Sequence, residues 1–193
     1  MLSQLKPALL MTIVLTIVTG ILYPLLVTGA AQTLFAHKAN GSLITKNGVV
    51  VGSALIGQNF AKPEYFHGRP SAAGTTGYDA TASSGSNLGP TNPDLAKRLQ
   101  KDAAAYQAEN QTKSAVPADA VTMSGSGLDP DISPANALIQ AHRVAHARGV
   151  TESDLQSLVT AHTQARQLGM IGEPRVNVLE LNLALDERFP VRH

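Results

Sequence analysis

The sequence predicts an α+β protein in which a single N-terminal transmembrane helix precedes one domain of mixed helices and strands. Three observations lead to this prediction: an uncharged apolar run near the start, a hairpin signal at Asn47-Gly48, and capped helical patterns from Asn92 onward. We therefore expect residues 1–6 to form a short head, residues 7–36 the transmembrane helix and its flank, and residues 37–193 one domain outside the membrane.

The run from Pro7 to Ala36 contains no charged side chain. About 20 apolar residues span the hydrocarbon core of a bilayer, whereas the apolar core of a cleaved signal peptide has only about 7–15. We therefore predict a retained anchor, and a single helix cannot enclose a path for a solute. Gly20 and Pro24 lie inside the run and are predicted to face a partner helix, because small residues allow close approach. The alternative is that glycine and proline are simply commoner in membrane helices.

The large domain is predicted to lie outside the cytoplasm, because a six-residue head is easier to leave inside than to translocate. Lys6 and Lys38 flank both ends of the apolar run, so the positive-inside bias is weak. The absence of cysteine fits an oxidising compartment without proving one. With 15 Lys and Arg against 14 Asp and Glu, the chain lacks the basic excess of a nucleic-acid binder, so no nucleic acid is expected as a partner.

The first elements after the anchor are a hairpin and a long loop. Residues 42–53 are typical of two short strands around Asn47-Gly48, because both central residues of a type I′ turn need positive φ. Residues 57–93 are rich in Gly, Ser, Thr, Ala and Pro, which is a loop composition. Loops this long are usually functional or disordered, and the aromatic residues in this one argue against disorder.

Three helices are predicted after the loop, over residues 93–109, 134–149 and 151–169. Each begins after a residue that favours the N-cap position: Asn92, Ser133 and Thr151. Glycine ends the second and third. Residues 120–123 are a candidate strand. Residues 176–185 place leucine at alternate positions, as in a strand, but consist of good helix formers, so both interpretations stay open.

The sequence indicates no catalytic residue and no metal site. His142 and His146 share a helix face, but Arg143 stands where a zincin has its glutamate, so surface or partly packed histidines are expected. Ser126 lies between glycines outside any Gly-x-Ser-x-Gly pattern, which favours a turn role. The segment Ser124–Gly127 could form a small anion-binding nest, and an ordinary Gly-rich turn is the alternative.

Several segments, in order along nearly the whole chain, together resemble one protein family. They are Gly20-Ile-Leu-Tyr-Pro-Leu25, Ala39-Asn-Gly-Ser-Leu43, Gly52-Ser-Ala-Leu-Ile-Gly-Gln-Asn-Phe60, Tyr65-Phe-His-Gly-Arg-Pro-Ser-Ala72, Ser84-Gly-Ser-Asn-Leu-Gly-Pro-Thr-Asn-Pro93, Val121-Thr-Met-Ser-Gly-Ser-Gly-Leu-Asp-Pro130, Ile132-Ser-Pro134, the pair Gln140 and Arg143, and Gly172-Glu-Pro-Arg-Val-Asn-Val-Leu179. The chain resembles the C subunit of the Kdp-type potassium-transporting ATPase of bacteria and archaea, the KdpC family. Ser84 and Met123 stand where the family has smaller residues, and neither departure affects the resemblance.

The resemblance implies a single-span subunit of a four-protein potassium pump in the bacterial inner membrane. Its partners would be a channel-like subunit that carries potassium, a P-type ATPase subunit that hydrolyses ATP, another small single-span subunit, and the lipid bilayer. The C subunit would be a non-catalytic accessory protein that assembles and stabilises the complex and raises the ATP affinity of the ATPase subunit. It would bind no cofactor tightly.

The resemblance also places nucleotide contact at five residues: Ser124, Gly125, Ser126, Gly127 and Gln140. An extracytoplasmic domain would not meet cytosolic ATP, and the chain has no Walker A motif, so the residues themselves argue against this implication. A membrane-anchored extracytoplasmic hydrolase that uses Ser126 with a helix histidine is the alternative function class.

The long loop is predicted to dock against the channel-like subunit, because aromatic and arginine side chains often dominate interfaces. Together with Gly20 and Pro24 in the anchor, the predicted docking residues are Gln58, Phe60, Tyr65, Phe66, Arg69, Ser86, Asn87 and Asn92. The alternative is that these residues pin the loop onto the core of their own domain.

Overall fold

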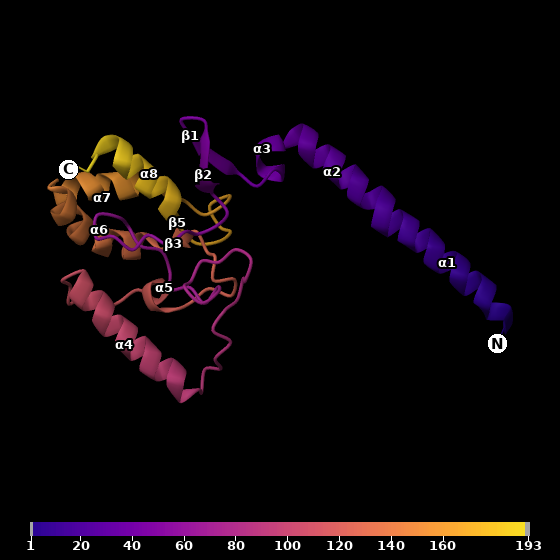
Figure 1. Cartoon of the computed structure of the whole chain (residues 1–193), viewed down its shortest axis with the longest axis horizontal. Helices are drawn as coiled ribbons and strands as arrows, with labels where there is room; N and C mark the ends of the chain where they lie inside the picture. The colour runs from indigo at the N-terminus through magenta and orange to yellow at the C-terminus, as the bar shows by residue number, and fades with distance from the viewer. Residues whose placement is uncertain (1, 192–193) are drawn as a thin grey trace. The chain divides into compact units, whose positions relative to one another are not determined.

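The computed structural model describes residues 2–191 and confirms a mixture of helices and strands behind one N-terminal apolar helix (Figure 1). It divides into two compact units that meet between Val51 and Gly52. The first unit contains the apolar helix and most of the hairpin. The second unit, which we call the body, contains all later elements.

The apolar helix runs without interruption from Leu5 to Leu34, and its 30 residues make it long and apolar enough to cross a membrane. It consists of α1 (Leu5–Ile17), a π-helical turn (Val18–Leu22) and α2 (Tyr23–Leu34). A 3₁₀ turn (Leu2–Gln4) precedes it and the short α3 (Ala36–Ala39) follows it. At 1.5 Å per residue the helix is about 45 Å long, more than the roughly 30 Å of a hydrocarbon core.

The π-helical turn lies directly before Pro24, which explains why it forms there. Proline has no N–H to donate, and its ring clashes with the carbonyl one turn earlier in a regular helix. The Tyr23 N–H instead reaches back to the Val18 carbonyl, so that the wider turn makes room for the ring. Threonine hydroxyls along the helix donate to carbonyls four residues earlier, as Thr12 does to Ala8 at 2.9 Å, and need no water.

The predicted hairpin is confirmed. Strands β1 (Leu43–Lys46) and β2 (Val49–Ser53) form a two-stranded sheet. The two turn residues, Asn47 and Gly48, have φ values of 52° and 78°, as a type I′ turn requires.

The body contains five helices and a small antiparallel sheet within the part of the chain that the structure describes. The helices are α4 (Pro93–Glu109), α5 (Ala118–Val121), α6 (Pro134–Arg148), α7 (Glu152–Ala161) and α8 (Val178–Arg188). The strands are β3 (Asp131–Ile132), β4 (Thr163–Gln164) and β5 (Arg175–Asn177), in the order β3-β5-β4. Ile132 and Thr163 lie opposite Val176 in the two ladders.

The core of the body forms where α6, α7 and α8 pack together against this sheet (Figure 1). It is built from Ile132, Ala137, Ala141, Val144, Ala145, Leu155, Leu158, Val159, Val176, Val178, Leu181 and Leu185, together with Phe66 from the long loop. The predicted N-caps are confirmed, because Asn92, Ser133 and Thr151 each accept a hydrogen bond from an N–H in the first turn of α4, α6 and α7.

Two sequence predictions are wrong. Residues 120–123 do not form a strand, because Ala118–Val121 closes one helical turn after Pro117, a residue whose extended backbone suits a helix start. The third helix stops at Ala161 rather than near Gly169, since Thr163 and Gln164 leave the helix to pair with β5.

The ambiguous segment 176–185 uses both of its patterns in turn. Residues up to Asn177 form β5, and the Asn177 side chain then accepts a hydrogen bond from the Glu180 N–H and begins α8.

Candidate functional site

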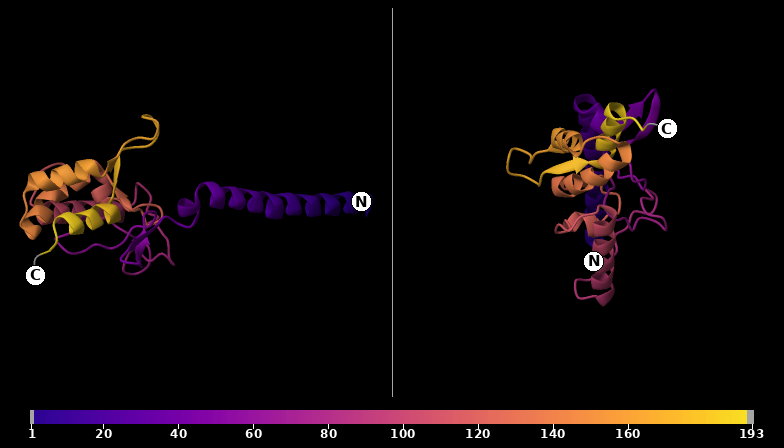
Figure 2. Two further views of the ribbon diagram at one scale, coloured as in Figure 1. Left: turned by 90° about the horizontal axis from the view of Figure 1, so that it is seen from above. Right: turned by 90° about the vertical axis from the view of Figure 1, so that its left-hand side faces the viewer.

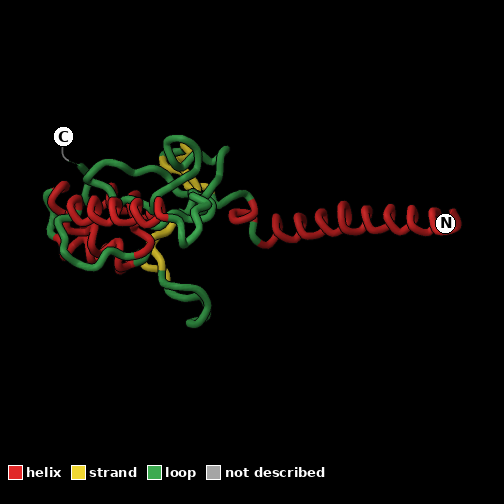
Figure 3. Tube along the Cα trace, turned by 90° about the horizontal axis from the view of Figure 1, so that it is seen from below, coloured by secondary structure: helices red, strands yellow, loops and turns green. Residues whose placement is uncertain are grey.

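The long loop, residues 57–92, contains no helix or strand and yet is buried or half-buried over much of its length (Figure 3 draws all loops in green). Its Phe66 ring is completely buried in the core. A loop cannot be buried unless its peptide groups find partners, because an unsatisfied buried N–H or C=O costs free energy. The site is therefore built from the side chains that supply those partners.

Two buried amide side chains clamp consecutive residues of the loop. Asn182 of α8 accepts a hydrogen bond from the Phe66 N–H at 2.9 Å and donates one to the Phe66 carbonyl at 2.9 Å. Gln140 of α6 makes the same two bonds to His67, at 2.7 and 3.0 Å. A primary amide offers one donor edge and one acceptor edge, so each side chain replaces a neighbouring strand. Phe66 and His67 are thus held between two helices.

Two arginines of α6 fix the loop just before the clamp. Arg143 donates to the carbonyls of Pro63 and Tyr65 at 2.6 and 3.0 Å, and also to Gln140 and to Asn110. Burial lowers the pKa of Arg143 below its usual range.

Arg148 donates to the Glu64 carbonyl at 2.7 Å and to the Asp186 carboxylate at 2.8 Å. Its guanidinium lies 4.8 Å from the centre of the Tyr65 ring, and the Tyr65 hydroxyl donates to Asp186. These bonds are charge-assisted and hold the loop strongly.

A second attachment joins the loop to the segment 122–129. Arg69 forms an ion pair with Asp129 at 2.7 Å and donates to the Thr122 carbonyl. The Ser71 hydroxyl donates to the Gly127 carbonyl at 2.6 Å. The Tyr78 hydroxyl donates to the Arg69 carbonyl at 2.6 Å, and burial raises the pKa of Tyr78 to about 12. The middle of the loop is thus folded back on itself.

Groups of the predicted anion nest at Ser124–Gly127 bond within the protein, and one of the nest's main-chain donors, the Gly127 N–H, is among them. The Gly127 N–H donates to the Ser124 hydroxyl, and the Ser126 hydroxyl accepts from the Leu128 N–H. The Ser126 carbonyl accepts from the N–H of Ser84 in the long loop. The segment is therefore joined to the long loop, and the choice between an anion nest and an ordinary turn stays a prediction.

The side-chain amide of Gln140 is also hydrogen-bonded within the protein. Its amide is 2% exposed and bonds to His67, Asn136 and Arg143. Nucleotide contact by Gln140 or by Ser124, Gly125, Ser126 and Gly127 stays a prediction, and the geometry assigns these residues structural work.

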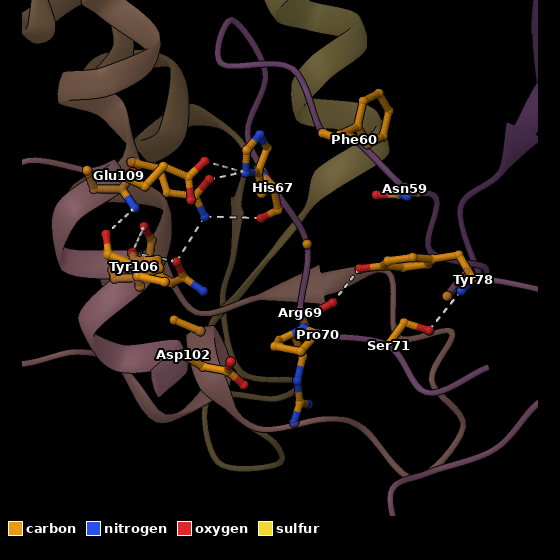
Figure 4. Close-up of a pocket in the computed structure, with 18 of the residues that line it drawn as sticks. Asn59, Phe60, His67, Arg69, Pro70, Ser71, Tyr78, Asp102, Tyr106 and Glu109 are labelled. Carbon is orange, nitrogen blue, oxygen red and sulfur yellow. Dashed lines mark hydrogen bonds and ion pairs between the residues drawn. The ribbon is translucent and has the colours of Figure 1, made fainter. Parts of the chain in front are cut away.

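A cavity of about 470 Å³ lies between the loop and α4 (Figure 4). Asp102, Tyr106 and Glu109 line it from α4, while Asn59, His67 and Tyr78 are among the residues that line it from the loop. The Tyr106 hydroxyl donates to the Asn136 side chain at 2.8 Å, which ties α4 to α6.

His67 stands at the edge of this cavity with both ring nitrogens in use. Nδ1 lies 3.2 Å from a Glu109 carboxylate oxygen and Nε2 lies 3.0 Å from the Lys62 carbonyl. Burial, followed by the nearby Arg143 charge, lowers the pKa of His67, and the two oxygen contacts act in the opposite direction. A neutral imidazole carries one N–H and donates to only one of these oxygens, so the lowered pKa and the two oxygen contacts favour different protonation states.

The predicted docking residues fall into two groups. Phe66 is a correction, because a completely buried ring has no surface to offer a partner. Tyr65 and Arg69 are half-buried and bonded within the body, as the alternative interpretation predicts. The others retain partial or full exposure: Gln58, Phe60, Ser86, Asn87 and Asn92. Docking stays a prediction for these and for Gly20 and Pro24, which are exposed on the apolar helix.

The clamp residue Asn182 was not predicted from the sequence. A signal was present, because Asn182 interrupts the apolar residues of α8 at a position that faces the core and is 1% exposed. A buried asparagine must bond to something, so a polar residue on an apolar helix face indicates a main-chain partner elsewhere.

Comparison with known proteins gives one consistent family. The family model described as "KdpC: K+-transporting ATPase, c chain" matches residues 5–187. A "Potassium-transporting ATPase KdpC subunit" from Caulobacter vibrioides is 65% identical over 98% of this chain and 96% of its own length. Proteins of the same description from Gemmatimonas aurantiaca and Koribacter versatilis are 59% and 53% identical, over 96% and 98% of this chain and 94% and 97% of their own lengths.

These matches extend through the apolar helix and the body alike, so the resemblance seen in the sequence is confirmed. The chain belongs to the KdpC family, whose members are subunits of the Kdp potassium-transporting ATPase.

Proposed function

We propose that this chain is a non-catalytic accessory subunit that assembles and stabilises the channel-like and ATP-hydrolysing subunits of the complex. The observation that carries the proposal is the clamp on the long loop. The buried polar side chains of α6 and α8 bond to the loop main chain, and Gln140 also bonds to Asn136 and Arg143 of its own helix. The body is therefore a scaffold that holds a loop in a fixed shape.

The apolar helix supports the same role. Its side chains, apart from that of Ala31, are exposed, so in a membrane they face lipid or other helices. A Cβ added at Gly20 would meet only the Thr16 methyl group, at 3.9 Å, so this side of the helix is open for a neighbour. We place potassium in the channel-like subunit and any change in ATP affinity in the ATPase subunit, because one helix encloses no pore.

The alternative of a serine hydrolase gains no support from the site. Within residues 2–191 the Ser126 hydroxyl bonds to Ser124 and to the Leu128 N–H, and no histidine contacts it. His142 contacts the Glu152 carboxylate at 3.1 Å instead. Purified chain assayed alone for ester and ATP hydrolysis should show neither activity, and Ser126→Ala should assemble normally.

The decisive experiment for the accessory role is co-purification. An affinity-tagged chain solubilised from membranes in mild detergent should bring down the other subunits with potassium-stimulated ATPase activity. Gly20→Leu should reduce their recovery, while Gly89→Leu, outside the apolar helix and at a position where an added Cβ meets nothing within 4 Å, is the matched control. Recovery of a complete and active complex from cells that lack this chain would refute the proposal.

Sidedness is a separate part of the proposal. We place the body outside the cytoplasm and the short head inside, because translocation of a long domain depends little on flanking charge. Protease added to spheroplasts should then digest the body without lysis. Digestion only after lysis would reverse the orientation while leaving the assembly role intact.

A further inference from the structure

The connection between β4 and β5 forms an arm that projects from the body (Figures 2 and 3). We call residues 164–174 the arm, and every one of them is exposed. Its tip carries three large apolar side chains: Leu168 is 85% exposed, Met170 75% and Ile171 58%. Scattered exposed leucines are ordinary, but three such side chains around one turn form a patch.

The arm is a well-formed hairpin rather than a loose loop. Gln167 and Ile171 exchange two main-chain hydrogen bonds, both of 2.9 Å. The Met170 and Gly169 N–H groups donate back to Gln167 and Arg166, which closes the turn. Arg166 and Glu173 form an ion pair of 2.6 Å across the arm. The apolar side chains are therefore presented in one defined arrangement.

A leucine at position 168 does not favour the stability of this turn. It adopts a φ of 52°, a left-handed conformation that glycine and asparagine occupy far more readily than leucine does. Its side chain also packs against almost nothing, so water contacts the whole isobutyl group. Strained backbone of this kind is a reason to look for a function.

We propose that the arm tip inserts into an apolar pocket on another protein subunit of the same membrane complex. The proposal adds a second contact surface to the accessory role proposed above and rests on it. Exposed aliphatic side chains on an ordered hairpin suit a pocket, because little conformational entropy is lost when they bind.

Charge favours a protein pocket over the lipid surface. The arm carries only one cation, Arg166, and Glu173 neutralises it. Segments that enter the membrane interface typically combine unpaired Lys or Arg with Trp or Tyr. The arm has no Lys, Trp or Tyr, and its one arginine is paired. A neutral, purely aliphatic tip matches a neutral, apolar recess.

The first test places a reporter at the tip, which is straightforward because the chain contains no cysteine. Leu168→Cys, labelled with an environment-sensitive fluorophore, is compared with the label at Ala165→Cys in the arm's base. Both are measured in vesicles of phosphatidylethanolamine and phosphatidylglycerol that hold the chain alone, and then in the assembled complex. We expect a blue shift and several-fold protection from iodide at position 168 in the complex only.

Other outcomes overturn the proposal in distinct ways. A blue shift in vesicles with the chain alone would mean that the tip enters lipid. A shift that grows with the concentration of the chain alone would mean that two copies meet at their tips. A tip that stays accessible to iodide in the complete complex would mean that no partner covers it, whereas failure of the unsubstituted chain to form the complex would instead contradict the accessory role.

The second test separates docking from folding. Leu168→Asn supplies a residue that suits positive φ, so the variant should fold at least as well as the parent. It removes an apolar anchor, so recovery of the partner subunits at limiting concentration should fall by about tenfold, which corresponds to about 1.4 kcal/mol of binding free energy. Leu138→Asn, the same change at a leucine exposed on α6, is the control and should assemble normally. Equal recovery for both variants would overturn the proposal.

Discussion

The long loop and the arm differ in how each is held in its conformation. The loop, residues 57–92, has no regular structure, yet Phe66 at its centre is completely buried and its main chain is bonded to side chains of α6 and α8. The arm, residues 164–174, satisfies its own main chain as a hairpin, yet all of its side chains are exposed.

The difference shows that regular structure and attachment to the core are independent. Hydrogen bonds within the arm keep it ordered without any packing, so its sequence is free to serve another surface. The loop has no internal ladder and depends on charged and amide side chains far away in the sequence. Substitutions in the loop's supports should therefore unfold the body, while substitutions in the arm should leave stability almost unchanged.

The largest expected effect is at Arg143. Arg143→Ala would remove the donor to the Pro63 and Tyr65 carbonyls and to the Asn110 side-chain oxygen inside the body. Because breaking a buried charged network typically costs about 3–5 kcal/mol, we expect the free energy of unfolding to fall by that order. Denaturant unfolding of the full chain in detergent measures it. The control is Arg166→Ala in the arm, where an exposed ion pair contributes about 1 kcal/mol or less. Equal losses for both variants would contradict the comparison.

The clamp gives the next largest effect. Asn182→Leu keeps the branching of the side chain but removes both partners of the Phe66 peptide groups. Each buried group left unsatisfied costs about 1–3 kcal/mol, so we expect a loss of roughly 2–4 kcal/mol. Hydrogen exchange at the Phe66 amide should accelerate together with the loss of stability. Gln167→Leu in the arm is the control and should change neither quantity; slow exchange at Phe66 in Asn182→Leu would show that the clamp is dispensable.

These two supports also mark how far the sequence alone could lead. The hairpin and the N-caps at Asn92, Ser133 and Thr151 were predictable, because each depends on residues within one turn of the chain. The partner of Asn182 lies 116 positions away, and no local pattern specifies which main-chain groups it will meet.

The end of α7 was predicted wrongly for the same reason. Residues 162–168 have no strong helix breaker before Gly169, and only pairing of Thr163 with Val176 in β5 ends the helix early. Leu168 lies inside the range predicted for the third helix and is instead at the exposed tip of the arm. Tertiary pairing outweighed local propensity there.

We expect pH to have a smaller effect on the stability of the chain, and this effect comes from His67 in the loop. Burial lowers the pKa of His67 in the folded chain below its usual value of 6.5. As pH falls through that value, the unfolded chain binds the proton more readily than the folded chain, so stability should decrease toward acidic pH. His67→Gln should reduce this decrease, as measured by melting temperature against pH. A wild-type chain that becomes more stable as this histidine protonates would show that the Glu109 contact outweighs burial.

The smallest expected effect on the free energy of unfolding is at the arm tip, where the direction of the change tests the comparison. Leu168 and Gly169 both have positive φ, 52° and 76°. A leucine in this conformation costs about 1–2 kcal/mol relative to its preferred backbone, and asparagine recovers part of that cost. Leu168→Asn should therefore raise the free energy of unfolding of the full chain in detergent by up to about 1 kcal/mol. Gly169→Ala should lower it by about 1 kcal/mol, because alanine resists a left-handed backbone that glycine adopts freely. A loss of stability in Leu168→Asn would mean that the leucine packs within its own chain, and the arm would then be attached to the body in the way that the loop is.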